Sequence, residues 1–266
     1  MPRPLQSEPT MTHTARCFAS ALFGLASWSA LPSEVAFAQM PKRGEIFINS
    51  TISSSGEERT SQSNLWVLDV YYKPMRMISV ELTNPKTGEK KLEHVWYIAY
   101  RVVHRKSGER VDEKAPKNEV DPPVSPPLFI PEGTLVVTDN DRQDVFPDQV
   151  IPEALAAINQ REKANYKTAV SVVGPLPEAT EAGSGDDSAM AGVMMWRGID
   201  PEADRYTVFL SGFSNGIRKL NGPDDMPIVQ TKTIMQKYWR RGDRFDQTEP
   251  EIIADPKDPE AHWIYR

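Results

Sequence analysis

Apolar and polar positions alternate over much of residues 65–240, and this period of two indicates half-buried β-strands. In the segment 75–82, even-numbered and odd-numbered side chains fall on opposite faces. The segment 95–103 differs, because aromatic and β-branched residues occupy both faces, which is typical of a central strand. Turn residues separate the segments. The pattern predicts strands at 65–72, 75–82, 95–103, 134–138, 193–196, 206–213 and 228–239.

One helix interrupts this series of strands. Ile151, Ala154, Leu155 and Ile158 recur at helical spacing, and a proline at position 152 suits a first turn, which needs no amide hydrogen there. We therefore expect a short helix at about 152–163.

Two segments have the composition of polar loops. Prolines at 121–127 cannot donate to a β-ladder and favour an extended, semi-rigid loop. Residues 175–190 are rich in glycine, serine and acidic groups, which predicts a mobile loop. The expected fold is mainly β: an antiparallel Ig-like β-sandwich with one inserted short helix and long polar loops.

The chain before residue 65 has a different character. Arg16 precedes a short apolar run, and small residues at Ala36 and Ala38 suit a signal peptidase. We interpret 1–38 as a signal peptide cleaved between Ala38 and Gln39, with Met11 as a second possible start. An uncleaved anchor is the alternative, but the run is shorter than the roughly 20 residues that span a membrane.

Processing leaves three further regions. Residues 39–64 are rich in serine, threonine and glycine and predict a flexible leader. Residues 65–240 form the predicted sandwich domain, and 241–266 form an acidic tail that ends in aromatic residues. A chain of this length has room for one sizeable domain or two small ones.

Composition limits the cell compartments and the classes of partner that we expect for this protein. The one cysteine, Cys17, lies within the predicted signal peptide, so the processed chain has no thiol for a disulfide, a metal site or a nucleophile. The net charge of −6 argues against nucleic-acid partners and against electrostatic adhesion to anionic lipid. We expect a protein of the periplasm or cell envelope with no stable membrane span after cleavage.

No motif predicts a catalytic, cofactor or metal site. The acidic segment 139–144 lacks the glycine and glutamate of an EF-hand. His94 and His104 lie at opposite ends of one predicted strand, too far apart to share a metal ion. Ser211–Ser214 lacks the glycine pattern of a nucleophile elbow, and Gly212–Gly216 is better explained as a hairpin turn.

Tryptophans provide the one candidate for ligand contact. Trp196 and Trp239 are candidates for a platform on which a sugar ring stacks, although most buried tryptophans serve packing. Trp96, in a predicted central strand, is expected in the core.

The sequence resembles two groups of known proteins. Trp96 in an early strand and Tyr206 in a late one resemble immunoglobulin and fibronectin III domains. The stretches 96–103, 209–215 and 237–243 are similar to an uncharacterised family of secreted proteins from planctomycete-type bacteria. That resemblance covers most of 65–250. It implies an envelope location and an Ig-like core, and it implies no activity.

These observations predict a non-enzymatic secreted or envelope protein that acts as an interaction or structural module. Its expected partner is another envelope protein or a glycan, with no role for nucleic acid. The alternative is a carbohydrate-binding module or a glycan-active enzyme, which rests on the tryptophans and on acidic loop residues.

Overall fold

The computed structural model describes residues 48–50, 54–62, 64–84, 86–106, 127–139, 142–181, 184–185, 187–223, 226–240 and 252–266. The predicted signal peptide 1–38, the cleavage site between Ala38 and Gln39, and most of the Pro-rich segment 121–127 lie outside these residues. Every described helix and strand belongs to the compact unit Pro41–Arg266.

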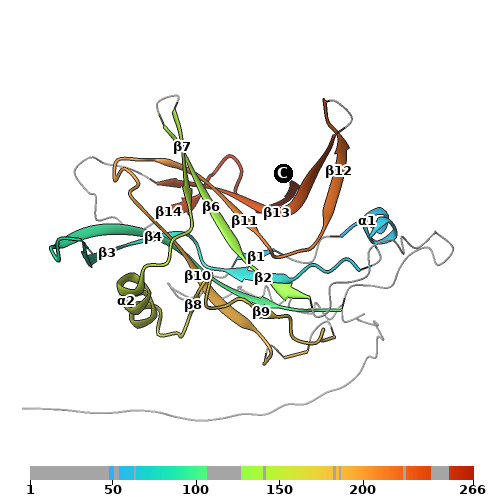
Figure 1. Cartoon of the computed structure of the whole chain (residues 1–266), viewed down its shortest axis with the longest axis horizontal. Coiled ribbons are helices and arrows are strands. Elements are labelled where there is room, and N and C mark those ends of the chain that lie inside the picture. The colour runs from blue at the N-terminus through green and yellow to red at the C-terminus, as the bar shows by residue number, and fades with distance from the viewer. Residues whose placement is uncertain are drawn as a thin grey trace, which may run out of the picture. The chain divides into compact units, whose positions relative to one another are not determined.

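The fold is mainly β, which confirms the prediction of an antiparallel β-sandwich (Figure 1). The six-stranded sheet holds β1 (Ile48–Ser50), β2 (Asp69–Tyr72), β3 (Arg76–Thr83), β4 (Lys90–Val103), β8 (Lys167–Thr168) and β10 (Met190–Arg197). The seven-stranded sheet holds β6 (Glu132–Asp139), β7 (Arg142–Pro147), β11 (Arg205–Ser211), β12 (Ile217–Asn221), β13 (Pro227–Arg240), β14 (Ile252–Ala254) and β15 (His262–Tyr265).

Four further elements lie outside these two sheets. β5 (Leu128–Phe129) and β9 (Gly174–Pro175) form a small two-stranded sheet, and the helices are α1 (Gly56–Ser61) and α2 (Pro152–Glu162). Only β8 and β10 pair in parallel among the described strands.

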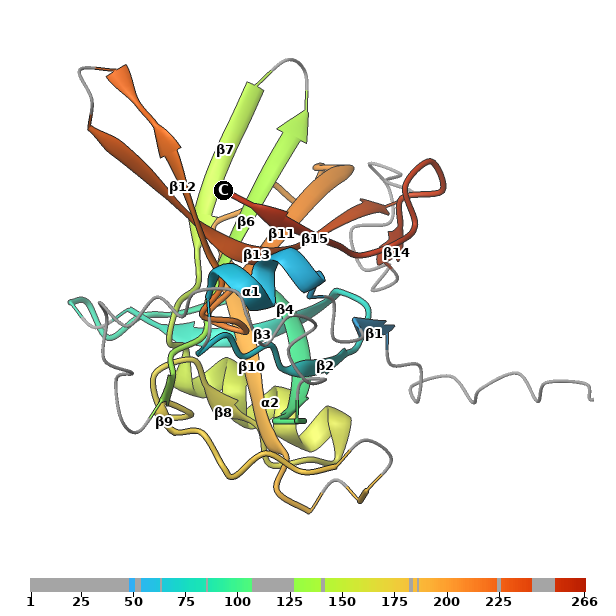
Figure 2. The same ribbon diagram turned by 90° about the vertical axis from the view of Figure 1, so that its right-hand side faces the viewer.

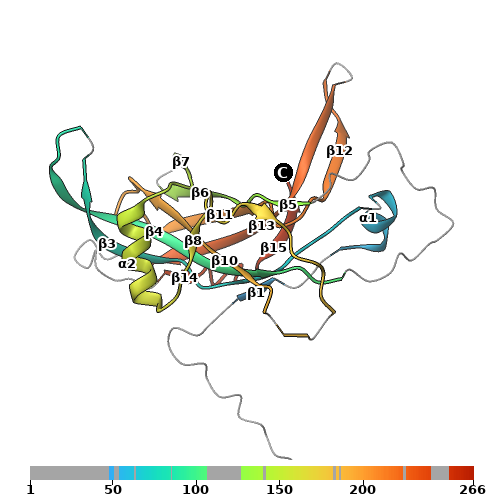
Figure 3. The same cartoon turned by 60° about the horizontal axis from the view of Figure 1, so that its bottom comes forward.

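β4 is the central strand of the six-stranded sheet, as its sequence predicts. It pairs with β2 and β3 along one edge and with β10 along the other. Trp96 and Tyr100 face the seven-stranded sheet and join the large core between the two sheets. Val95 and Tyr97 face the opposite way and pack in a second core with Ile158 of α2. The six-stranded sheet is therefore the middle of three layers (Figure 3).

The helix α2 occupies the range predicted for it. Pro152 stands in its first turn, and Lys163 ends it in a left-handed conformation with φ 51°. Ala154 and Ile158 are its buried residues, so its apolar face covers the outer side of the six-stranded sheet.

Two predicted boundaries differ from the structure. The segment 39–64, predicted as a flexible leader, contains β1 and α1, because both find partners far along the chain. The predicted tail 241–266 contains β14 and β15, which pair with β13 as part of the seven-stranded sheet. In the predicted mobile loop 175–190, Thr180 forms a β-bridge with Arg105.

A charged cluster fixes the end of α2 to the middle sheet. Glu162 accepts hydrogen bonds from Lys73, Arg76 and Tyr97, each at 2.7 Å, and its side chain is almost fully buried. Burial raises the pKa of Glu162, but the hydrogen bonds from Lys73 and Tyr97 and the charge of Arg76 outweigh it and lower the pKa. Glu162 is therefore held ionised as the counter-ion of two cations.

A second, partly buried carboxylate joins the two sheets. Where the chain passes from β7 to α2, the Asp148 N–H donates to Gly133 O at 2.8 Å, and its carboxylate accepts the Met195 N–H at 2.6 Å. Burial raises the pKa of Asp148 from 3.8 to about 6, although the N–H groups of Met195 and Gln149 oppose the shift.

Glu162→Gln is expected to lower the free energy of unfolding at pH 7 by about 3 kcal/mol, because it removes the buried carboxylate that pairs with Lys73 and Arg76. Glu153→Gln, on the exposed first turn of the same helix, is the matched control and should cost less than about 1 kcal/mol. Urea denaturation measures both. Equal effects of the two substitutions would contradict this role of Glu162.

Asp148→Asn is expected to have a higher free energy of unfolding than the wild type, and this difference should grow as the pH rises from 4 to 7.5. A carboxyl whose pKa is raised by folding stabilises the protein at pH values below its pKa in the unfolded state. This contribution is lost as the pH rises through its pKa in the folded state. The gain of the variant should grow by about 2–3 kcal/mol over that range. Denaturation of both proteins at several pH values tests this, and a pH-independent difference would refute it.

Candidate functional site

The hairpin of β12 and β13 projects from its sheet, as does the hairpin of β6 and β7 (Figures 1 and 2). We call β12 together with residues 226–231 the arm. Its strands are antiparallel, with Leu220 directly opposite Ile228. Five large aliphatic side chains of the arm are exposed: Ile217, Leu220, Met226, Ile228 and Val229. Exposed apolar groups gathered in one place mark interaction surfaces more often than isolated ones do.

One face of the arm lies on the same side of β13 as the core of the protein. Side chains alternate along β13, and Ile234 and Tyr238 point into the core between the sheets. The same face reaches the arm through Gln230, Ile228 and Met226, where the exposed fraction rises to 48% for Ile228 and 68% for Met226.

β12 completes this surface with two side chains. Arg218 and Leu220 lie directly opposite Gln230 and Ile228, so they share their face, and Leu220 is 42% exposed. We call these two residues with Gln230, Ile228 and Met226 the arm face. It combines three exposed apolar side chains with one cation and one amide, and it lies beyond the buried Lys232.

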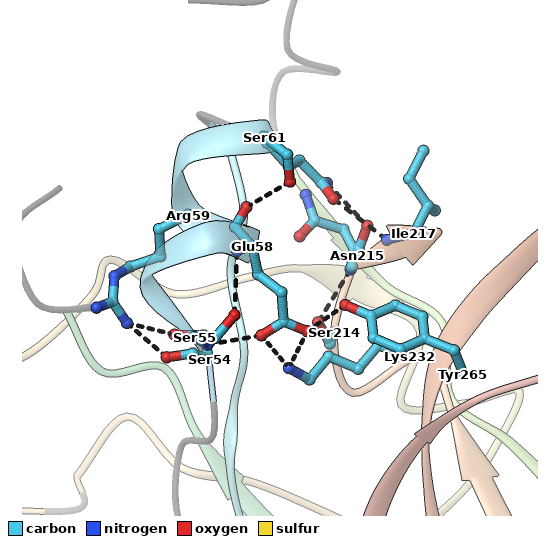
Figure 4. Close-up of polar contacts among 12 residues, drawn as sticks. Ser54, Ser55, Glu58, Arg59, Ser61, Ser214, Asn215, Ile217, Lys232 and Tyr265 are labelled. Atoms are coloured by element: carbon cyan, nitrogen blue, oxygen red, sulfur yellow. Dashed lines mark hydrogen bonds and ion pairs between the residues drawn. The ribbon is translucent and has the colours of Figure 1, made fainter. Parts of the chain in front are cut away.

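The helix α1 lies at the base of the arm and marks the end of the covered region (Figure 4). Ser55 caps the helix: its hydroxyl accepts the Glu58 N–H at 3.1 Å, and the Glu58 carboxylate accepts the Ser55 N–H at 2.7 Å. This capping box starts a helix of one and a half turns that has no buried residue. Its position therefore depends on polar contacts with the sheet.

The main polar contact joins Glu58 to the base of the arm. Both carboxylate oxygens of Glu58 accept hydrogen bonds from Lys232 Nζ, at 2.8 and 2.9 Å, and Tyr265 donates its hydroxyl to the same carboxylate. The Lys232 side chain is only 4% exposed, so it needs this counter-ion. Burial raises the pKa of Glu58, but the hydrogen bonds from Lys232, Tyr265 and Ser55 lower it to about 2.

A second set of contacts holds the start of β12. Gln62, which follows α1, donates to Asn215 O at 2.9 Å and accepts the Ile217 N–H at 3.2 Å. The Asn215 side chain accepts the Trp66 N–H at 2.8 Å. The base of the arm is thus fixed from both sides, and the arm beyond it has no described cover.

The groups on the arm face are suited to binding. They offer aliphatic contact area, the amide of Gln230 and one guanidinium, that of Arg218, which stacks 4.2 Å from the centre of the Tyr265 ring. Lys219 adds a second exposed cation on the opposite face. Such a surface can bury apolar side chains and pair with negative charge.

Trp196 cannot serve in the predicted sugar platform. It is fully buried between the sheets, directly opposite Trp96, and its indole N–H donates to Gly133 O at 3.4 Å. A stacking platform requires an exposed ring face, which packing in the core removes. Trp239 lies on β13 of the other sheet and is partly exposed, so ligand contact at Trp239 stays a prediction.

The histidines lie apart and make separate local contacts. His94 and His104 lie at the two ends of β4, where His94 contacts Ser79 Oγ at 2.9 Å and His104 contacts Pro177 O at 2.8 Å. His262 pairs with Asp258 at 2.6 Å. Within the described ranges, no three histidine, cysteine or acidic side chains are grouped to hold a metal ion. Asn140 and Asp141 of the acidic segment 139–144 lie outside those ranges.

The segment Gly212–Gly216 is not the hairpin turn that its sequence predicts. It lies between β11 and β12, which both pair with β13, so the chain makes a bulge and continues in the same direction. Gly212 adopts φ 81°, and a Cβ there would lie 1.9 Å from Ile130 O. The glycine is needed for this close approach.

The arm and α1 were not predicted as functional elements. The capping box Ser55–Glu58 is visible in the sequence and could have indicated α1. The exposure of Leu220 and Ile228 has no local sequence signal, because it depends on where the other sheet ends.

No helix in the described part of the chain is both long and apolar enough to cross a membrane. The chain matches no known protein family, no curated protein and no solved structure.

Glu58→Gln is expected to release α1 from the sheet, because a neutral amide cannot balance the buried charge of Lys232. Amide hydrogen exchange at 58–62 should become at least about tenfold faster, the equivalent of one lost charge-assisted hydrogen bond. Glu57→Gln, one residue away and exposed, is the control and should leave exchange unchanged. Unchanged protection in both variants would show that Glu58 does not hold α1.

Proposed function

We propose that this protein is a non-enzymatic interaction module of the cell envelope, and that the arm is its binding element. The observation that carries the proposal is the arm face, on which the large apolar side chains of Leu220, Met226 and Ile228 lie exposed close together. Leaving such a surface in water costs free energy that a partner would recover, at about 25 cal/mol per Å² of apolar area buried.

The sequence supports the location. An N-terminal segment with the pattern of a signal peptide and a processed chain without cysteine suit a bacterial periplasm or envelope. The resemblance to a secreted family of planctomycete-type bacteria supports the same location.

An Ig-like assignment of the sandwich belongs to this proposal. Trp96 lies in the core, and the Tyr206 hydroxyl donates to Ala203 O at 2.5 Å. A tyrosine that bonds back to the chain just before its own strand resembles the tyrosine corner of Ig domains.

A glycan partner is the less supported candidate. Of the two tryptophans considered for stacking, only Trp239 is accessible, and a sugar platform is usually built from more than one exposed ring. The arm is aliphatic and offers no aromatic ring among its described residues. A protein surface with apolar side chains is the better match.

We expect a photo-activatable cross-linking residue at position 228 to capture one partner of discrete mass in the intact cells that make the protein. Adding Leu220→Ser should reduce the yield about tenfold, because one leucine contributes roughly 1.5–3 kcal/mol when buried. Gel electrophoresis and mass spectrometry of the adduct provide the measurement.

The matched control places the same cross-linking residue at Leu92. That side chain is also exposed, but it lies on the β3–β4 hairpin among Lys90, Lys91 and Glu93. Equal capture at both positions, or capture at neither, would reject the arm as the binding element.

A further inference from the structure

We propose that the outer edge of β12 binds an extended acidic segment of a partner protein as an additional antiparallel strand. The proposal rests on the proposed function, since it names the class of partner that the arm takes. It follows from three features: the order in which this edge is occupied, the direction of its backbone groups, and its charge.

Other segments of the chain pair with this edge of the sheet as far as the start of the arm. β11 and β12 follow one another along β13, and β6 pairs with β11 as far as Ser211. The segment 66–68 then takes the place of the next strand: the Leu68 N–H donates to Phe213 O at 3.0 Å, and the Asn215 N–H donates to Trp66 O at 3.3 Å. The protein's own chain therefore shows that this edge accepts strands.

This occupied stretch ends at Ile217. Its N–H points away from β13 and donates to the side chain of Gln62, whereas the neighbouring Gly216 O accepts the Lys232 N–H of β13. Because antiparallel strands bond alternately to either side, the N–H and C=O groups of Lys219 and Asn221 also point outward. Among the described strands, β12 pairs with β13 alone.

The charge of the edge selects the partner. β12 carries Arg218 and Lys219 and no acidic residue, in a chain whose net charge is −6. Arg218 stacks on Tyr265, whereas no acidic side chain of the described ranges pairs with Lys219. A strand with acidic residues opposite Lys219 and apolar residues beside Leu220 complements both faces.

A second copy of β12 fits this edge less well. The antiparallel register that overlaps all of β12 is centred on Lys219 and places two lysines directly opposite each other. Like charges at directly opposite positions destabilise a sheet. An acidic partner strand removes this repulsion.

The test measures fluorescence anisotropy of a labelled nine-residue peptide that alternates valine and glutamate, titrated with the full-length protein. We expect binding that weakens at least about tenfold when alternate peptide nitrogens are methylated, since this removes strand donors without changing the side-chain order. The same loss is expected when lysine replaces glutamate.

Lys219→Pro should also weaken binding at least about tenfold, because proline removes one outward donor and leaves the bonds to β13 intact. Lys219→Thr is the matched variant that keeps the donor and removes only the charge, so it should lose less. Both peptide comparisons use the wild-type protein and do not depend on the folding of either variant.

Each outcome has a defined meaning. Equal binding of the methylated peptide, or of the lysine peptide, overturns the proposal. If no peptide binds while position 228 still captures a partner in cells, strand addition is wrong and the proposed function stands. If position 228 captures nothing, the proposed function fails as well. A protein dimer that Lys219→Pro abolishes, seen by sedimentation, would make a second copy the occupant.

Discussion

The layered structure depends on β4, a strand that is buried on both faces. Trp96 and Tyr100 require a sheet on one side, and Val95 and Tyr97 require a cover on the other, which α2 provides. The six-stranded sheet is consequently a middle layer. The seven-stranded sheet is an outer layer, and β13 extends farther than the sheet that it packs against. The uncovered arm is a direct consequence of this difference in extent.

The buried lysine lies where the cover ends. Lys232 occupies the core face of β13 between the fully covered Ile234 and the exposed Ile228. A buried ammonium without a counter-ion would cost several kcal/mol, so the carboxylate of Glu58 is required at this boundary. The short helix α1 carries that carboxylate and has no buried residue of its own. Its function in the fold is therefore electrostatic, and it closes the core at the point where the arm begins.

The sequence predicted those elements whose cause is local. Alternation identified β3 and β13, the two apolar faces of 95–103 identified a central strand, and helical spacing identified α2, whereas β7 and β12 were not among the predicted strands. Elements that depend on distant partners were missed. Glu58 meets Lys232 at a separation of 174 residues, so a segment rich in serine and glycine looked like a linker. Trp196 ends a continuous apolar run, Val193–Trp196, and its register opposite Trp96 places it in the core, whereas Trp239 lies in a strand whose burial alternates.

The charge pattern of the arm is best understood as a form of selectivity. Exposed strand edges invite pairing with any extended chain, and proteins commonly protect them with lysine, proline or charged side chains. β7, at the other end of the sheet, has such protection in Arg142, Asp144 and Pro147. β12 combines the protective Lys219 with aliphatic side chains on both faces of the arm. A cation on an apolar edge repels an identical edge and attracts an acidic one, so the same residue that prevents self-association would favour one class of partner.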